Sequence, residues 1–328
     1  MAREFQKVSA ASAPSPSPGL DQWILSLRPD LSAQRRVLSV DQPSRWLIET
    51  EPDSAEQLRS VLTVFLTNRE CPWRCLMCDL WQHTTLHSVP LGAIPRQIQV
   101  ALHAASPAHW IKLYNAGSFF DSGAIPPSDH AAIAEQCRSF ERVVVECHPT
   151  LVGPRVLAFR DQLNGTKLEV ALGLETAHPE VLAKLNKRMS TQDFARAAGF
   201  LRDSDIAVRA FVLIKPPYLD SAQAQDWAVR SAEFALDSGA EVVSLIPTRS
   251  GNGALDELER HGEFSEPSLE LVEEVFDKVL QLKRGRVFLD VWDLERLGKD
   301  EVNYVERRVR LVQMNLSQRV LLRVGVSR

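Results

Sequence analysis

Short apolar runs rich in β-branched residues alternate with helical patterns along most of this chain, and this alternation restricts the folds open to it. The runs predicted to be strands cover residues 61–67, 110–115, 142–147, 168–176, 207–215, 241–247 and 286–292. Nearly continuous apolar strands, each followed by a helix, indicate an α/β protein with a parallel sheet covered by helices. The pattern fits both a barrel and an open doubly wound sheet. In both, functional groups lie at the carboxyl ends of the strands.

The segments that flank this pattern are predicted to be extensions of one core domain. Residues 1–40 form an N-terminal extension, whose Pro-, Ser- and Ala-rich part predicts disorder over at least residues 1–20 and no targeting signal. Residues 41–295 form the core, with an accessory strand at 45–50, and residues 296–328 form a basic tail. The last 28 residues contain six arginines against two acids, and the acidic stretch 256–277 offers them partners within the chain.

The composition argues against several classes of protein. A net charge of −4 and an isoelectric point near 6.1 do not suit a strongly basic nucleic-acid coat protein. No apolar run approaches the roughly 20 residues of a membrane helix, so we expect no membrane span. Three of the five cysteines fall within eight positions, which does not suit a disulfide framework. We therefore expect a cytoplasmic protein whose reduced thiols are free to bind metal.

The strongest motif is a cysteine loop directly after the first predicted strand. Cys71, Cys75 and Cys78 are spaced C-x3-C-x2-C, and soft thiolates at this spacing select zinc or an iron–sulfur cluster. Three cysteines leave one iron of a four-iron cluster free to bind a substrate or cofactor. The alternative is a Cys3His zinc site completed by His83 or His87. The position of the loop at the carboxyl end of a strand favours an active-site cofactor.

This loop in this setting resembles the radical S-adenosylmethionine superfamily, over roughly residues 60–295. The resemblance implies a partial (β/α)6-type TIM-like barrel, the radical SAM core, with short N- and C-terminal extensions. It implies that Cys71, Cys75 and Cys78 hold a [4Fe–4S] cluster whose fourth iron chelates S-adenosylmethionine. One electron, from a reductase or a flavodoxin- or ferredoxin-type donor, then cleaves the cofactor to a 5′-deoxyadenosyl radical that abstracts hydrogen from the substrate.

Within this superfamily, the chain resembles the branch of elongator-type, methylthiotransferase-type and coproporphyrinogen-oxidase-type enzymes. The runs LYNAGSFFD, GLETAHPEVLAKLNK and LIKPP are most similar to the archaeal radical SAM enzyme family of archaeosine synthesis. That family acts on a modified 7-deazaguanine in tRNA, so the resemblance implies tRNA as a substrate. A small-molecule substrate stays open, because the chain is net acidic and shows no appended nucleic-acid-binding module.

Further cofactor-binding residues are expected at the ends of the second and third predicted strands. Gly117 resembles the glycine whose backbone receives the methionine amino group, and only glycine permits so close an approach. Ser118 stands where the family usually has an acid. Glu146 matches a glutamate that contacts the methionine part of the cofactor in the coproporphyrinogen-oxidase-like enzymes. Its neighbours Cys147 and His148 fit core positions better than extra metal ligands.

The next two strand ends supply the remaining candidates. Glu175 aligns with the residue that binds the ribose hydroxyls, and Lys187 stands where the family has an arginine for the methionine carboxylate, with Arg188 beside it. Arg209 and Lys215, on the fifth predicted strand, suit an anionic group of cofactor or substrate. The competing interpretation is a non-catalytic protein on the same fold, with a structural or sensing cluster or a zinc ion.

Overall fold

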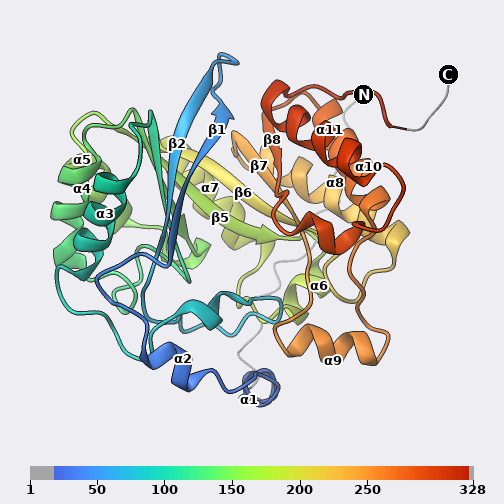
Figure 1. Cartoon of the computed structure of the whole chain (residues 1–328), viewed down its shortest axis with the longest axis horizontal. Helices are drawn as coiled ribbons and strands as arrows, with labels where there is room; N and C mark the ends of the chain where they lie inside the picture. Colours follow the sequence, from blue (N-terminus) through green and yellow to red (C-terminus); the bar gives the residue numbers. More distant parts are fainter. Residues whose placement is uncertain (1–17, 325–328) are drawn as a thin grey trace.

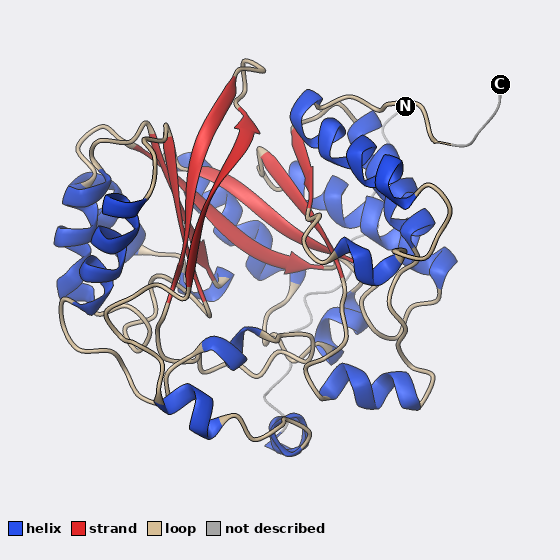
Figure 2. Cartoon of the chain, in the orientation of Figure 1, coloured by secondary structure: helices blue, strands red, loops and turns tan. Residues whose placement is uncertain are grey.

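One sheet organises the molecule. The structure is a computed structural model that describes residues 18–324. The strands follow one another in the sheet in chain order. Strand β1 is antiparallel to β2, and all later neighbours are parallel. Figure 2 shows the sheet curling into an incomplete barrel with its helices outside. The predicted α/β partial barrel is confirmed. The strands are β1 Arg45–Pro52, β2 Leu58–Leu66, β3 Trp110–Asn115, β4 Arg142–Cys147, β5 Lys167–Glu175, β6 Ala207–Ile214, β7 Val242–Pro247 and β8 Arg286–Leu289.

Helices cover the convex face of the sheet. In Figure 1, α3, α4 and α5 lie on one side and α8, α10 and α11 on the other, while α1, α2 and α9 lie below the sheet. The α-helices are α1 Pro18–Ser26, α2 Ser32–Arg36, α3 Ala93–Ala104, α4 His130–Cys137, α5 Pro154–Gln162, α6 Pro179–Lys184, α7 Thr191–Asp203, α8 Ser221–Asp237, α9 Ala254–Arg260, α10 Leu269–Gln281 and α11 Tyr304–Ser317. Short 3₁₀ turns are η1 Leu80–His83, η2 Pro127–Asp129, η3 Pro149–Leu151 and η4 Leu294–Leu297.

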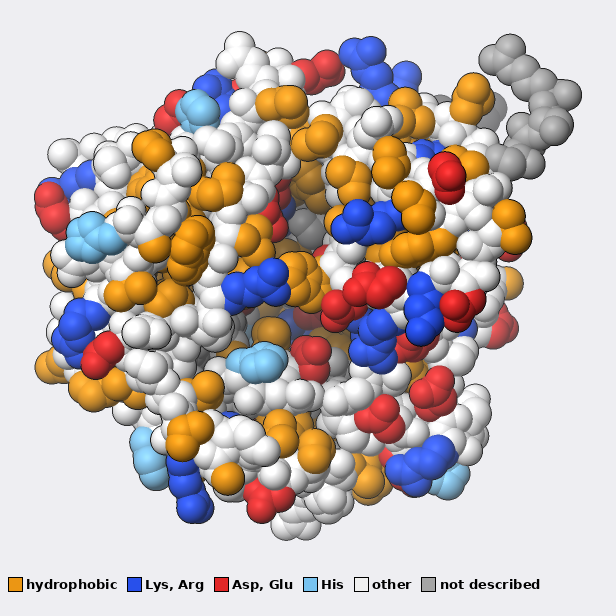
Figure 3. Space-filling view, in the orientation of Figure 1, with side chains coloured by type: hydrophobic (Ala, Val, Ile, Leu, Met, Phe, Trp, Pro, Cys, Tyr) orange, Lys and Arg blue, Asp and Glu red, His pale blue; other side chains and the backbone are white. Residues whose placement is uncertain are grey.

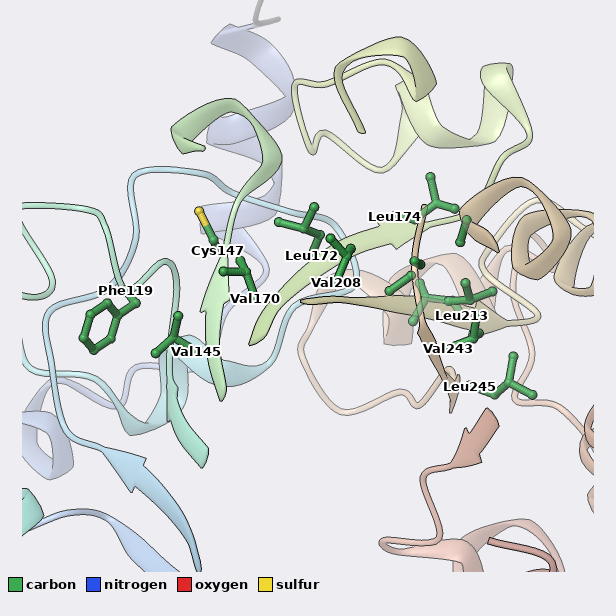
Figure 4. Packing of buried hydrophobic residues seen from close by; sticks show 14 of the residues in the cluster. Phe119, Val145, Cys147, Val170, Leu172, Leu174, Val208, Leu213, Val243 and Leu245 are labelled. Atoms are coloured by element: carbon green, nitrogen blue, oxygen red, sulfur yellow. The ribbon is translucent and has the colours of Figure 1, made fainter. Parts of the chain in front are cut away.

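The main apolar core lies between the sheet and these helices. Side chains alternate between the two faces of a strand, so every second residue points outward toward the helices. Val145, Val170, Val208 and Val243, one from each of β4 to β7, are at most 1% exposed and belong to this core (Figure 4). This burial explains why the strands are nearly continuous apolar runs in the sequence.

The concave face carries a layer of charge instead, in the amino-terminal half of the barrel. Arg209 on β6 donates to Glu51 of β1 at 2.8 Å and to Glu169 of β5 at 2.7 Å, and Lys112 of β3 binds Glu51 and Glu49. Burial opposes the charge on Arg209, but the Glu51 and Glu169 carboxylates raise its pKa. Since β1 and β6 are far apart in the sheet, these ion pairs cross the lumen. We refer to Glu49, Glu51, Lys112, Glu169 and Arg209 as the charge layer.

Helix α11 protects the edge strand β8. The Asn315 side chain accepts from the Leu289 N–H at 2.7 Å and donates to the Leu289 carbonyl at 2.8 Å. Gln318 makes the same pair of bonds with Val287, at 2.7 and 2.9 Å. The two amides take the place of a further strand, which blocks pairing with another chain at this edge.

The predicted basic tail pairs within the chain, as the sequence indicated. Arg310 binds Asp277 at 2.6 Å, Arg307 binds Glu273 at 2.8 Å, and Arg323 also binds Asp277, at 3.0 Å. Three arginines of the tail are therefore occupied by the acidic face of α10.

The N-terminal extension lies across the cysteine loop. Residues 1–17 of the segment predicted to be disordered lie outside the described residues, whereas α1 begins at Pro18. Arg28 and Arg35 both bind Glu70, at 2.7 and 3.3 Å. A Cβ on Gly253 would lie 2.1 Å from the Leu27 carbonyl oxygen, so the end of α1 touches the start of α9. Within residues 18–324, no helix combines the length and hydropathy that crossing a membrane requires.

Candidate active site

The cysteine loop follows β2 and is held from both sides. The Leu76 N–H donates to the Leu185 carbonyl at 2.9 Å, at the end of α6. From the loop before α9, the Asn252 amide donates to the Leu76 carbonyl at 2.8 Å, and from the loop before α7 the Asn186 amide donates to the Arg74 carbonyl at 2.7 Å. These hydrogen bonds to the loop backbone fix the path of the loop without using its thiols.

The thiols suit an iron–sulfur cluster by their chemistry. Cys71, Cys75 and Cys78 are all free and partly buried, and burial raises the pKa of each thiol, to about 12 for Cys75. Their thiolates therefore need nearby positive charge, which metal ions supply. In a cubic cluster each thiolate binds a different iron, so the three need to surround the cluster and not a single ion.

The residues expected for the alternative Cys3His zinc site are not grouped around one point. His83 and His87, its candidate fourth ligands, are both exposed. Among the residues that the structure describes, no three His, Cys, Asp or Glu side chains are grouped to hold one metal ion.

Gly117 lies directly against the cysteine loop. Its φ is +137°, and a Cβ at this position would lie 2.6 Å from the Cβ of Cys71. Only glycine allows both this conformation and this approach. The neighbouring Ser118, also predicted as a cofactor ligand, is fully buried, and its hydroxyl donates to the Cys147 sulfur at 3.5 Å. It is part of the core under the loop.

Asn115 and Glu146 form an incompletely satisfied polar pair at the ends of β3 and β4. The Asn115 N–H donates to the Glu146 carboxylate at 3.4 Å, and burial raises the pKa of Glu146 to about 8. Both polar atoms of the Asn115 side-chain amide are buried without a partner in the structure. Buried polar groups normally bind something, so this pair marks a place for a polar ligand.

Glu175 and Lys187 form a buried ion pair above the end of β5. The Lys187 ammonium lies 2.6 Å from the Glu175 carboxylate. Burial opposes the charge on Lys187, but the Glu175 carboxylate holds its pKa above the ordinary value. A Cβ on Gly173 would lie 2.3 Å from the Glu175 oxygen, so this glycine makes room for the pair. Arg188, the alternative to Lys187, binds Asp21 of α1 instead.

Two of these strand ends have a left-handed backbone conformation. Glu175 has a φ of +66° and Lys215 a φ of +57°, and the register of β5 shifts between Gly173 and Glu175. Left-handed conformations are unfavourable for residues other than glycine and cluster at functional sites. Lys215 lies at the end of β6, where its ammonium donates to the Ser265 hydroxyl at 2.6 Å.

His148 packs against the cysteine loop through Trp73. The Trp73 ring stacks on His148, with ring centroids 4.2 Å apart and planes 9° from parallel. Both imidazole nitrogens are occupied, one by the Thr150 hydroxyl at 2.7 Å and one by the Lys187 carbonyl at 2.9 Å. Burial lowers the pKa of His148 to about 3, so the ring is neutral. His148 and Cys147 are core residues and not extra metal ligands.

Arg209, predicted as a cofactor-binding residue, does not lie with this group. It lies near the start of β6, and its guanidinium donates to Glu51, Glu169 and Ser244. The alternation of residues along a strand does not distinguish an inward residue at the amino end from one at the carboxyl end. This is why the sequence predicted Arg209 as a cofactor-binding residue.

Sequence reasoning missed Asn115, Gly173 and Trp73. An isolated glycine within a predicted strand is a known signal of a bulge or a close approach, and Gly173 satisfies both descriptions. Asn115 was visible as the polar last residue of an apolar strand. The stack of Trp73 on His148 joins two distant segments and left no local signal.

Comparisons with known proteins identify two relatives that share a name. Archaeosine synthase subunit beta of Methanosarcina acetivorans is 28% identical over 220 residues, which cover 63% of this chain and 63% of that protein. The protein of the same name from Thermococcus kodakarensis is 30% identical over 114 residues, covering 33% of this chain and 35% of its own length. The chain therefore spans less than two thirds of these relatives. No family model matches the sequence.

Among solved structures, methylornithine synthase (PylB) superposes with a TM-score of 0.53 over 93% of this chain and 77% of that one. The sequences are 11% identical, so this likeness concerns the fold. The expected resemblance to the archaeal enzymes of archaeosine synthesis is confirmed by these relatives, and the fold likeness agrees with the expected partial barrel. The particular relatives are the archaeosine synthase beta subunits, in agreement with the runs noted in the sequence.

Proposed function

We propose that this protein is a radical S-adenosylmethionine enzyme. The observation that carries the proposal is the cysteine loop at the carboxyl edge of the barrel, with Gly117 against Cys71. The ends of β3 and β4 add the unpartnered side-chain amide of Asn115 and the Glu146 carboxyl, which accepts from the Asn115 N–H. When bound there, the cluster and S-adenosylmethionine supply a 5′-deoxyadenosyl radical that abstracts hydrogen.

The chain's own residues divide the work of holding this cofactor. Cys71, Cys75 and Cys78 are the cluster ligands. The backbone at Gly117 and the carboxylate of Glu146 receive the methionine amino group. Hydrogen bonds donated by the N–H groups of that amine favour the ionised form of the buried Glu146 carboxyl, whose pKa burial raises.

The Glu175–Lys187 ion pair serves the ribose and the methionine carboxylate of the cofactor. Glu175 can accept hydrogen bonds from both ribose hydroxyls, while Lys187 holds it in place and faces the methionine carboxylate. Lys215, at the end of the neighbouring strand β6, borders the substrate side of the site. An external reductase or a flavodoxin- or ferredoxin-type protein provides the electron.

For the substrate, we propose a 7-deazaguanine-type nucleoside of tRNA. The support is the similarity to two proteins named archaeosine synthase subunit beta. The three tail arginines are engaged with α10 and do not support a tRNA-binding tail, so the support lies in the core alone. Nucleoside profiling of tRNA from a deletion strain, beside metabolite profiling, separates this substrate from a small molecule.

Reductive cleavage is the test of the enzyme class. Anaerobically reconstituted protein is reduced with dithionite, incubated with S-adenosylmethionine, and assayed for 5′-deoxyadenosine by chromatography. We expect slow formation without substrate, because binding the cofactor beside the cluster makes the electron transfer intramolecular. If the wild type forms no more product than the Cys75→Ala variant, even with cell extract added, the protein is a non-catalytic metal protein.

A further inference from the structure

The outer face of α11 carries a row of apolar side chains that the rest of residues 18–324 leaves exposed. We call Val305, Val309, Val312 and Leu316 the outer stripe. Val305 and Val309 are 67% and 46% exposed, and the other two are half-buried. Figure 3 shows hydrophobic side chains gathered at the upper right, where α11 lies in Figure 1. Contiguous exposed apolar side chains of this kind mark a contact with another protein surface.

The inner face of α11 is apolar as well, so the outer stripe is not needed to attach the helix. Leu311 and Met314 are fully buried in the main core. On the same side, Asn315 and Gln318 bind the edge strand β8 through their amides. A helix that is apolar on two faces packs against a neighbour on each of them. The sheet and α10 provide the inner neighbour, and residues 18–324 provide none on the outer side.

The spacing of the outer stripe is that of a helix that packs along another helix. Its members are four, three and four residues apart, which is the alternation of the a and d positions of a heptad repeat. Side chains at this spacing form one seam, which a second helix covers by knobs-into-holes packing. Val302 before α11 and Leu322 after it, 82% and 78% exposed, add apolar surface at the two ends. The seam therefore matches another helix of similar length and not a small molecule.

The charges at the two ends of α11 select a second copy of this helix as the partner. Residues 300–306 contain three acids and no basic residue, whereas residues 317–324 contain two arginines and no acid. Two copies placed antiparallel bring the acidic start of each helix beside the basic end of the other. A parallel arrangement would place like charges together, which is unfavourable.

The end charges are accessible for such a contact. Glu301 is exposed, and the Arg319 side chain is 74% exposed. Within the chain, Glu301 binds Arg307, and Arg319 lies 3.3 Å from Glu56. Exposed ion pairs contribute little to stability, so these two side chains can turn to a new partner at little cost.

The outer stripe is also complementary to itself in the antiparallel arrangement. In such a pair, Val309 of one copy faces Val312 of the other, and Val305 faces Leu316. Each contact occurs twice, related by a two-fold axis at the middle of the helices. One surface thus serves both copies, as closed two-fold symmetry requires.

We propose that α11 is the contact helix of a symmetric homodimer. The outer stripes of the two copies pack antiparallel, and Glu301 of each copy pairs with Arg319 of the other. In Figure 1, α11 lies on the opposite side of the molecule from α1 and α2, so the dimer leaves the cysteine loop of each copy accessible. The proposal goes beyond the proposed function and does not depend on the radical reaction.

Sedimentation equilibrium of the reconstituted full-length protein, under reducing and anaerobic conditions, tests the dimer over roughly 1–200 µM chain. We expect the mass to rise from that of one 36.7 kDa chain toward twice that value as the concentration increases. The Val305→Glu/Val309→Glu variant should stay monomeric throughout, because a dimer would bury unpaired carboxylates from both copies. Val100→Glu, at an exposed valine on α3, is the matched control and should dimerise as the wild type does.

A charge exchange tests the antiparallel arrangement. Glu301→Arg and Arg319→Glu each place like charges together at both ends of the dimer, so each should raise the dissociation constant about three- to tenfold. The double variant places opposite charges together again and should return the dissociation constant to that of the wild type. Circular dichroism of every variant verifies that the chain is folded.

Two results would overturn the homodimer. One is a wild type that stays monomeric over the whole range, which would leave the outer stripe to a partner of different sequence. The other is a Val305→Glu/Val309→Glu variant that still dimerises. A double charge variant that dimerises more weakly than both single variants would overturn the antiparallel pairing. None of these measurements uses 5′-deoxyadenosine formation, so failure of the dimer and failure of the proposed function are distinguishable.

Discussion

Both ends of the barrel bury polar and charged side chains, but only at the amino end does each side chain of the charge layer have a partner of opposite charge. At the amino end, every member of the charge layer meets an opposite charge, as Arg209 does with Glu51 and Glu169. At the carboxyl end, Glu146 keeps a carboxyl whose pKa burial raises to about 8, and the side-chain amide of Asn115, at the end of the neighbouring strand, has no partner within residues 18–324. Buried charges that are all paired stabilise a fold, whereas buried polar groups without partners are unfavourable until a ligand binds them. The difference indicates which end of the barrel is the site.

The largest expected effect tests the site end. Cys71→Ala, Cys75→Ala and Cys78→Ala should each abolish assembly of the cluster, because each removes the only protein ligand to one iron. Iron and sulfide content and the visible absorption of anaerobically reconstituted protein measure this. Cys137→Ala is the control, since Cys137 is buried in the core on α4 and should leave iron content unchanged. Full iron content in the triple alanine variant would refute the ligand assignment.

The next prediction tests the paired end. Arg209→Met should lower the free energy of unfolding by about 3–5 kcal/mol, since it leaves buried carboxylates short of a partner. Urea denaturation monitored by circular dichroism gives the value. Arg230→Met removes an exposed pair with Asp226 and should change stability by about 0.5 kcal/mol or less. A similar small loss in both variants would show that the charge layer does not stabilise the barrel.

Glu175 lies at the carboxyl end of the barrel but is paired with Lys187. A variant at this position therefore tests whether a paired residue at this end also binds the cofactor. Glu175→Ala should weaken S-adenosylmethionine binding by roughly 10- to 150-fold, the equivalent of about 1.5–3 kcal/mol for a charge-assisted hydrogen bond. The cluster should remain. Calorimetry on the reconstituted protein measures the affinity, with Glu180→Ala, an exposed position on α6, as control. Unchanged affinity would mean that the Glu175–Lys187 pair serves only the fold.

The last prediction concerns the dependence of stability on pH. Burial raises the pKa of Glu146 from 4.5 to about 8 in the folded protein, so the folded state binds the proton more tightly than the unfolded state. Its contribution to stability is then fully present below pH 4.5 and is lost as the pH rises to about 8. Glu146→Gln should remove this part of the decline. Parallel pH profiles of the unfolding free energy for both proteins would contradict the raised pKa.

Much of the fold was predictable because a buried strand appears in the sequence as a short run of apolar residues. The predicted runs 110–115 and 142–147 coincide with β3 and β4, and the accessory strand at 45–50 is β1. The predicted run 286–292 is longer than β8, which ends at Leu289. Beyond it the chain turns at Asp293, whose φ of +51° a local apolar pattern does not reveal.

The candidate site was predictable only in part. Cysteine spacing and the glycine of the second strand end were visible in the sequence, and the structure brings Gly117 against Cys71. Ser118 and Arg209 were placed by their positions on strands, yet one hydroxyl points into the core and one guanidinium into the charge layer. Whether a polar side chain meets a partner or a ligand depends on residues far away in the chain.

By itself, the sequence determined the parallel α/β order, the cysteine loop at a strand end and the pairing of the basic tail with acidic α10. Each of these follows from residue types at short spacing. Only the tertiary structure decided that Asn115 lacks a partner while Arg209 has three, and that Tyr114 meets Phe211 across the lumen. These contacts join strands distant in the chain, and the curl of the sheet, which no local pattern encodes, brings them together.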